Sequence, residues 1–180
     1  MKKTIIIFVI LISVLMTGCN NEPVSTTLGE TVFGAFTTTS IDGEPVDYQV
    51  FSESKLTMVN IWATFCGPCI EEMPALAQLN NEFGDDFRII GMVVDVTDMN
   101  GNILPNKKAE AEVIIQATGA DYLHLLPSKS LNSAYLSNVQ AVPETVFVDE
   151  NGNQVGQRYL GSRSKDEWQK IIEALLESVS

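Results

Sequence analysis

The 180-residue chain is predicted to form one α/β domain, a mixed β-sheet with helices packed on both faces. Two continuous apolar runs, at 58–63 and 89–94, are typical of strands that are buried on both sides, as in a parallel sheet. Segments with the spacing of helices follow these runs and also close the chain. Hydrophobic residues make up 45% of the chain and charged residues 19%, which suits a globular domain with a substantial core.

The predicted strands are bounded by turn signals. The Asp42–Gly43 dipeptide predicts a hairpin within residues 32–51, and Asn151–Gly152 predicts a second one, because two-residue hairpin turns favour these dipeptides. The remaining strands are predicted from β-branched and apolar runs. They lie at 55–63, 87–96, 122–126, 145–149 and 154–160.

The predicted helices lie at 70–83, 106–118, 130–138 and from 164 onward. Gly84 and Gly119 are suitable stop signals for the first two, because glycine adopts the backbone conformation that ends a helix. Ser164 and Glu167 have the spacing of a capping box, which starts the last helix. The predicted core-facing side chains of this helix are Trp168, Ile171, Ile172, Leu175 and Leu176.

The N-terminal segment is predicted to be a leader that takes no part in the fold. Lys2 and Lys3 precede an apolar stretch at 5–16, which is shorter than the roughly 20 residues that a membrane-spanning helix needs. The stretch ends in Leu-Met-Thr-Gly directly before Cys19, which resembles the lipobox of bacterial lipoproteins. This resemblance implies that Cys19 receives a diacylglyceride and becomes the new N-terminus, a two-chain anchor. A secreted protein that is cleaved nearby is the alternative.

The leader divides the chain into three predicted parts. Residues 1–18 form the signal peptide, and residues 19–31, rich in Asn, Ser, Thr and Gly, form a lipidated flexible tether. Residues 32–180 form the globular domain. The chain has three cysteines. With Cys19 assigned to the lipid, Cys66 and Cys69 remain as a pair.

Cys66 and Cys69 are separated by Gly67 and Pro68, between a predicted strand and a predicted helix. Unpaired backbone N–H groups and the helix dipole at a helix N-terminus favour a thiolate, the form that attacks disulfides. Cys66 is therefore the expected exposed attacker, and Cys69, one turn further along, the expected resolving thiol. Pro68 suits the first turn of a helix.

Other uses of the pair fit the sequence less well. Zinc needs four ligands, and only His124 and the lipid-bearing Cys19 remain outside the pair. A purely structural disulfide would close a very short loop and add little stability. A copper-binding chaperone that uses Cys66, Cys69 and His124 is an alternative, because thiolates bind Cu(I). We expect His124 to be an ordinary strand or loop residue, and we expect no metal and no cofactor besides the redox-active disulfide.

The run Trp-Ala-Thr-Phe-Cys-Gly-Pro-Cys at 62–69, with Pro74 five residues after the second cysteine, resembles the thioredoxin superfamily. It is most similar to the membrane-tethered TlpA and ResA group of extracytoplasmic thiol-disulfide oxidoreductases, over residues 32–180. The resemblance implies a thioredoxin-like fold, a central mixed sheet flanked by helices, with an N-terminal β-hairpin and a helical insertion. It also implies a cis peptide bond at Val142–Pro143, facing the cysteines. The implied substrate groove consists of Phe65, Gly67, Pro68, Val142 and Pro143.

Three positions bear on the mechanism. Asn60 stands where cytosolic thioredoxins place a buried aspartate that handles the proton of the resolving thiol. Glu72 matches a glutamate of the TlpA-like group, and its spacing of three from Cys69 places both on one side of the helix. We expect Glu72 to assist proton transfer; the alternative is a solvated glutamate like Glu71. Phe65 replaces the tryptophan usual before the first cysteine, so one N–H donor is lost.

The predicted function is reduction of disulfides in client proteins outside the cytoplasmic membrane. The resemblance implies a CcdA/DsbD-like membrane electron donor, and apocytochrome c or a methionine sulfoxide reductase as clients. A disulfide-forming oxidant is the alternative direction. A net charge of −12 argues against nucleic-acid partners. We expect a monomer, a lipoprotein on the outer face of the cytoplasmic membrane, or in the outer membrane if the source is Gram-negative.

Overall fold

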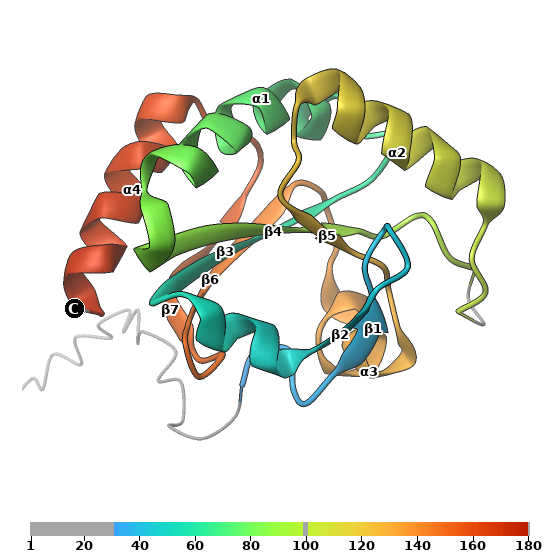
Figure 1. The fold of residues 1–180 in the computed structure, drawn as a ribbon, viewed down its shortest axis with the longest axis horizontal. Helices are drawn as coiled ribbons and strands as arrows, with labels where there is room; N and C mark the ends of the chain where they lie inside the picture. Colours follow the sequence, from blue (N-terminus) through green and yellow to red (C-terminus); the bar gives the residue numbers. More distant parts are fainter. Residues whose placement is uncertain (1–30, 99–100, 180) are drawn as a thin grey trace, which may run out of the picture.

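The computed structural model describes residues 31–98 and 101–179. A five-stranded sheet in the order β5-β4-β3-β6-β7 forms the centre of the domain, and β1 and β2 form a separate two-stranded sheet (Figure 1). The strands are β1 (Thr37–Thr39), β2 (Pro45–Asp47), β3 (Leu56–Trp62), β4 (Phe87–Val93), β5 (Leu123–Leu125), β6 (Glu144–Asp149) and β7 (Gln154–Leu160). The helices are α1 (Gly67–Glu82), α2 (Pro105–Thr118), α3 (Lys129–Ala134) and α4 (Lys165–Ser178), with short 3-10 turns η1 (Tyr48–Glu53), η2 (Gly84–Asp86) and η3 (Leu136–Asn138).

The sheet is mixed. β3, β4 and β5 are parallel neighbours, whereas β6 runs antiparallel to β3 and β7 antiparallel to β6. β3 is the central strand, and all seven of its residues are buried. This explains its mostly apolar sequence, broken by Thr57 and Asn60, since side chains on both of its faces enter a core.

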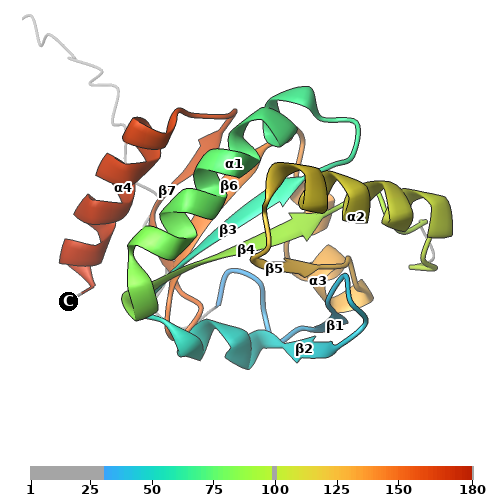
Figure 2. The ribbon, with the colours of Figure 1, turned by 45° about the horizontal axis from the view of Figure 1, so that its top comes forward.

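The two faces of the sheet carry different layers (Figures 1 and 2). Helices α1, α2 and α4 cover one face, where Met58 and Trp62 of β3 enter the core. The β1–β2 hairpin, η1 and α3 cover the other face, where Val59 and Ile61 enter a second core. Alternate residues of a single strand therefore hold the two layers together.

The predicted α/β class, mixed sheet and N-terminal hairpin are confirmed, with two differences in detail. α1 begins at Gly67 rather than at residue 70, because Cys66 caps it. The predicted helix at 130–138 is broken at Tyr135 into α3 and η3. The N-terminal hairpin forms a small two-stranded sheet of its own.

The remaining helix signals act as predicted. Gly119 ends α2 in the left-handed conformation, with φ 67°. Ser164 and Glu167 form both hydrogen bonds of the capping box at the start of α4. On α4, Trp168 and Ile172 are buried, while Ile171, Leu175 and Leu176 pack partly buried against the same core.

The predicted signal peptide (1–18), Cys19 and the predicted tether as far as residue 30 lie outside the described residues. Within 31–98 and 101–179, no helix combines the length and the apolar character needed to cross a bilayer.

Candidate active site

The two cysteines form a disulfide where β3 gives way to α1. The Cys66–Cys69 bond has an S–S distance of 2.01 Å and joins Cα atoms 5.3 Å apart. β3 ends at Trp62, and the short segment that follows turns the chain so that Cys66 becomes the N-cap of α1. The buried central strand β3 therefore leads directly to the cysteine pair at the N-terminus of α1.

The two sulfurs lie in different surroundings. Cys66 Sγ accepts a hydrogen bond of 3.2 Å from the backbone N–H of Cys69, so one free donor of the helix end points at this sulfur. Cys66 is 6% exposed and Cys69 is fully buried. Cys66 is thus less open than predicted, yet it is the more accessible of the two. Helix N-terminal donors stabilise a thiolate at this position when the bond is reduced.

The predicted groove is only partly assembled. Phe65, 73% exposed, and Val142 line one apolar hollow together with Val94, Leu136, Val139, Gln140 and Ala141. Gly67 and Pro68 are exposed on the adjacent start of α1 and do not line this hollow. The Val142–Pro143 peptide bond is cis, as the resemblance implied, and Pro143 is buried and does not line the hollow.

Glu72 is buried, so the alternative of a solvated helix glutamate is wrong for this residue, although it holds for the exposed Glu71. Oε1 of Glu72 accepts a hydrogen bond of 3.0 Å from Asn60 Nδ2 on β3. Oε2 accepts two, both of 3.1 Å, from the backbone N–H of Arg163 and from Trp168 Nε1 on α4. Three elements of the fold therefore hold this one carboxyl group.

Burial raises the pKa of Glu72 above its ordinary value, and the bonds from Trp168, Arg163 and Asn60 oppose that rise. Burial disfavours the charged carboxylate, whereas donated hydrogen bonds favour it. A carboxyl group in this balance can accept and release a proton closer to neutral pH than a surface glutamate can. One helical turn separates it from the buried Cys69.

Sequence patterns did not predict the contacts that Arg163 and Trp168 make with Glu72. These residues lie 91 and 96 positions from Glu72 along the chain. Apolar periodicity correctly placed Trp168 in the core, but it does not say which polar group an indole N–H meets there. A buried tryptophan usually finds an acceptor, and that rule is the only sequence signal available.

A polar network supports the segment before Cys66. Thr64 donates to Asp95 through its backbone N–H, at 2.9 Å, and through its hydroxyl, at 2.6 Å. Lys107 Nζ, near the start of α2, donates to the Thr64 hydroxyl at 2.9 Å and lies 3.7 Å from Asp95. The end of β4 and the start of α2 thus fix the backbone two residues before Cys66.

His124 is a buried strand residue, as predicted. Trp62 Nε1 donates to its Nδ1 at 3.2 Å, and its Nε2 lies 2.9 Å from the carbonyl oxygen of Ala120, to which it donates in that tautomer. Burial lowers the pKa of His124 to about 4. Both ring nitrogens are engaged, which leaves none to join the two cysteines around copper. Within the described ranges, no three His, Cys, Asp or Glu residues are grouped so as to hold a metal ion.

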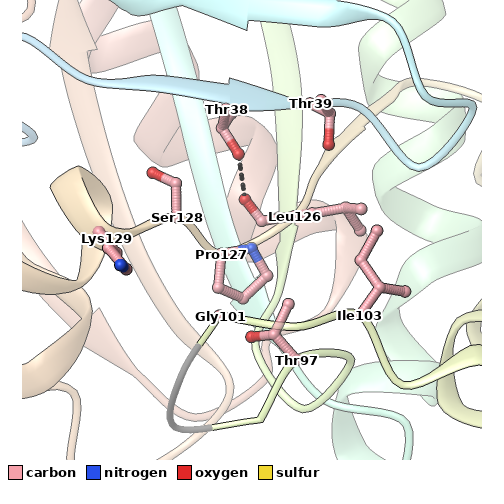
Figure 3. A pocket seen from close by; sticks show the side chains of 9 residues that line it. All are labelled: Thr38, Thr39, Thr97, Gly101, Ile103, Leu126, Pro127, Ser128 and Lys129. Carbon is pink, nitrogen blue, oxygen red and sulfur yellow. Dashed lines mark hydrogen bonds between the residues drawn. The ribbon is translucent and has the colours of Figure 1, made fainter.

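A second hollow lies between β1 and the segments that follow β4 and β5 (Figure 3). Thr38, Thr97 and Ser128 contribute hydroxyl groups to its lining, and Ile103 and Pro127 contribute apolar surface. The Thr38 hydroxyl donates to the carbonyl oxygen of Leu126 at 2.6 Å. None of the predicted site residues lines it.

Comparison with known proteins places this geometry in a family. The model of the family described as Redoxin matches residues 27–176. This chain belongs to the Redoxin family. The cysteine pair at the N-terminus of α1 therefore belongs to a Redoxin-family domain.

Named relatives give the activity. The chain is 28% identical over 140 residues to the thioredoxin-like protein YneN of Bacillus subtilis, covering 77% of this chain and 75% of that protein. It is 26% identical over 123 residues to the thiol-disulfide oxidoreductase ResA of Halalkalibacterium halodurans, covering 67% of this chain and 62% of that protein. This Redoxin-family chain is a thiol-disulfide oxidoreductase.

A solved structure supports the fold. The thioredoxin-family thiol:disulfide interchange protein of Chlorobium tepidum superimposes with a TM-score of 0.64 at 20% identity, covering 84% of this chain and 99% of that structure. The predicted thioredoxin-like fold is thereby confirmed.

Proposed function

We propose that this protein is a membrane-tethered reductase of protein disulfides that acts outside the cytoplasm through Cys66 and Cys69. The observation that carries the proposal is the asymmetry of the pair at the N-terminus of α1. Cys66 caps the helix and keeps some exposure beside the exposed Phe65, while Cys69 is fully buried behind it. An accessible attacker and a shielded partner are what a two-step exchange requires.

The exchange begins with both cysteines reduced. The Cys66 thiolate attacks a client disulfide, forms a mixed disulfide and releases one client sulfur as a thiolate that takes up a proton. The Cys69 thiol then loses its proton and attacks Cys66 Sγ. This step forms the Cys66–Cys69 disulfide, the bond found here, and releases the second client thiol. Two electrons pass from the protein to the client.

Glu72 is the proposed acceptor of the Cys69 proton. Its raised pKa supports this role, because a carboxyl group with a proton affinity nearer that of its partner is a better base. The full burial of Cys69 also supports it, since bulk water has little access to that thiol. Asn60, an amide, can orient Glu72 but cannot take the proton itself.

Reduction is the direction we favour over oxidation. Related Cys-x-x-Cys proteins span about −270 mV for thioredoxin to about −120 mV for the oxidant DsbA, a range wide enough to reverse the reaction. The Gly67–Pro68 dipeptide is shared with reducing thioredoxins. A potential near the thioredoxin end supports the reductase, and one near that of DsbA supports the oxidant.

The predicted leader supports the proposed location of the protein, and that location suggests its partners. The lipobox-like sequence before Cys19 supports a lipoprotein held on the outer face of the cytoplasmic membrane by residues 19–31. A protein placed there needs an electron donor within the membrane, of the CcdA/DsbD kind. Oxidised surface proteins, apocytochrome c or a methionine sulfoxide reductase are the clients that this position offers.

Client trapping tests the proposal. A Cys69→Ser variant of the full chain should accumulate mixed disulfides at Cys66 in cells, and these should disappear under reducing electrophoresis. Cys66→Ser is the matched control and should trap none. Reduction of insulin by the wild-type protein and its loss in Cys66→Ser should accompany trapping. Equal trapping by both variants would contradict the assignment of roles.

A further inference from the structure

The carboxyl group of Glu72 is held from the far end of the chain. Its Oε2 receives Trp168 Nε1 and the backbone N–H of Arg163, both at 3.1 Å. Trp168 lies on α4, which packs beside α1 over the same face of the sheet (Figure 2). Because Trp168 is fully buried, no water competes for this bond.

The indole ring of Trp168 has little freedom to turn. The guanidinium carbon of Arg163 lies 4.9 Å from the centre of the Trp168 ring and 4.9 Å from that of Tyr159. Tyr159 packs edge-on against Trp168, with ring centres 5.6 Å apart, and Phe147 closes another side at 6.2 Å. Packing on these sides keeps the ring N–H directed at Glu72.

Within residues 31–98 and 101–179, few charged or titratable groups act on Glu72. On its own helix, Cys69 lies one turn away. The Arg163 side chain lowers its pKa through its positive charge. Tyr122, before β5, has a pKa that is raised by burial and also by the charge of Glu72. From β3 the neutral amide of Asn60 contacts Glu72, and it also donates to Thr145 of β6 at 3.2 Å.

The direct hydrogen bonds must therefore stabilise most of the negative charge of Glu72. A bond donated to a charged group contributes more than one between neutral groups, and more again where water is excluded. Side-chain donors reach Glu72 only from Asn60 and Trp168 among the described residues. Of these two, Trp168 is the one that comes from outside the sheet.

We propose that Trp168 is a positioning residue whose indole N–H holds Glu72 ionised and oriented to take the proton of Cys69. The proposal rests on the proposed function and adds the C-terminal helix to its machinery. On this proposal α4 does more than cover the core, because its Trp168 side chain affects the pH dependence of the rate at which Cys69 resolves the mixed disulfide.

The test separates the two exchange steps with Ellman's reagent. The reduced full chain, purified in detergent, releases one thionitrobenzoate when Cys66 attacks and a second when Cys69 resolves the mixed disulfide. The rate of each release is measured against pH. Trp168→Phe removes the N–H and keeps an aromatic ring. Trp62→Phe is the matched control, since Trp62 is equally buried but donates to His124.

The expected result is specific to the second release. In Trp168→Phe the acid limb of its pH profile moves up by about one pH unit, because the carboxylate loses a charge-assisted bond. The first release and both releases of Trp62→Phe keep the wild-type profile. A Trp168→Phe profile that coincides with that of Trp62→Phe would overturn the proposal.

Two further variants separate the possible failures. In a Glu72→Gln background, Trp168→Phe should add no further shift, because the carboxylate is gone. If Glu72→Gln alone leaves the second release unchanged, the proposed role of Glu72 as proton acceptor is wrong. If Glu72→Gln changes the second release and Trp168→Phe does not, only the proposed role of Trp168 is wrong. Should Trp168→Phe fail to fold, benzothienylalanine at position 168 keeps the bicyclic shape without the N–H, and the same shift is expected.

Discussion

Asn60 Nδ2 lies 3.0 Å from Glu72 Oε1, so the amide on the central strand donates directly to the buried carboxyl group on α1. The same nitrogen also donates to Thr145 Oγ1 at 3.2 Å. The position that carries a proton-handling aspartate in cytosolic thioredoxins here supports a glutamate instead. The buried carboxyl group here lies on the helix, and its amide partner lies on the strand.

Asn60→Asp should place two carboxyl groups within hydrogen-bond distance in a buried site. Like charges so close cannot both ionise easily, so the pair should share one proton and its upper apparent pKa should rise. We expect the acid limb of the resolving step to move up by at least about one pH unit. The pH profile of the second thionitrobenzoate release measures this shift. Thr145→Val, which alters the same amide contact without adding charge, should leave the profile in place, and an unshifted Asn60→Asp profile would contradict the prediction.

Local patterns determine what the sequence could predict. The Cys-x-x-Cys pair, the turn dipeptides and the Ser164 cap are each encoded within a few residues, and each was placed correctly. The spacing of three between Cys69 and Glu72 likewise placed both on one side of α1, and both are buried in the structure. The interruption at Tyr135 was missed, because its hydroxyl donates to Glu144, a partner that the local helical pattern does not include.

Contacts between segments that are distant along the chain could not be predicted from the sequence. The donors Trp168 and Arg163 reach Glu72 only after α4 packs beside α1, and no spacing rule links them. Gly91 resembled an ordinary member of an apolar run, yet it pairs in register with His124. Such relationships depend on strand order and helix packing, which one sequence constrains only through its fold class.

His124 should make the domain sensitive to mild acid. Its pKa is about 4 in the folded chain against an ordinary 6.5, because burial disfavours the imidazolium. Between these values the unfolded chain binds more protons, so the free energy of unfolding should fall as pH falls, by up to about 3 kcal/mol. Urea unfolding across this range measures the loss. His124→Gln should show a smaller loss than the wild type; an equal loss in both would rule out His124 as its source. Glu72, with a raised pKa, contributes with the opposite sign in both proteins.

Gly91→Ala should destabilise the fold through His124. A Cβ at Gly91 would lie 2.1 Å from His124 Nδ1 and 2.5 Å from its Cε1, so the ring must move and its bonds to Trp62 and Ala120 must weaken. We expect a loss of at least about 2 kcal/mol in the free energy of unfolding. Thermal or urea unfolding measures it. In a His124→Ala background the same substitution should cost much less, and equal costs in both backgrounds would show that the two positions act independently.

Asp95 should control the order of the segment before Cys66. It accepts both the backbone N–H and the hydroxyl of Thr64, while Lys107 bridges the same two residues from α2. Asp95→Ala would leave the N–H of a buried threonine unpaired, at a cost of about 1–3 kcal/mol in the free energy of unfolding.

The effect of Asp95→Ala should also reach the chemistry, because Thr64 precedes Cys66 by two residues. We expect a slower first thionitrobenzoate release, since a loosened segment holds the capping sulfur less firmly against the helix N-terminus. Glu110→Ala is the matched control: Glu110 contacts Lys107 but not Thr64, so stability and the first release should both stay near wild type. If Glu110→Ala slows the first release as much as Asp95→Ala does, the prediction is wrong. The effect would then come from the charge of Lys107 and not from the backbone that Asp95 holds.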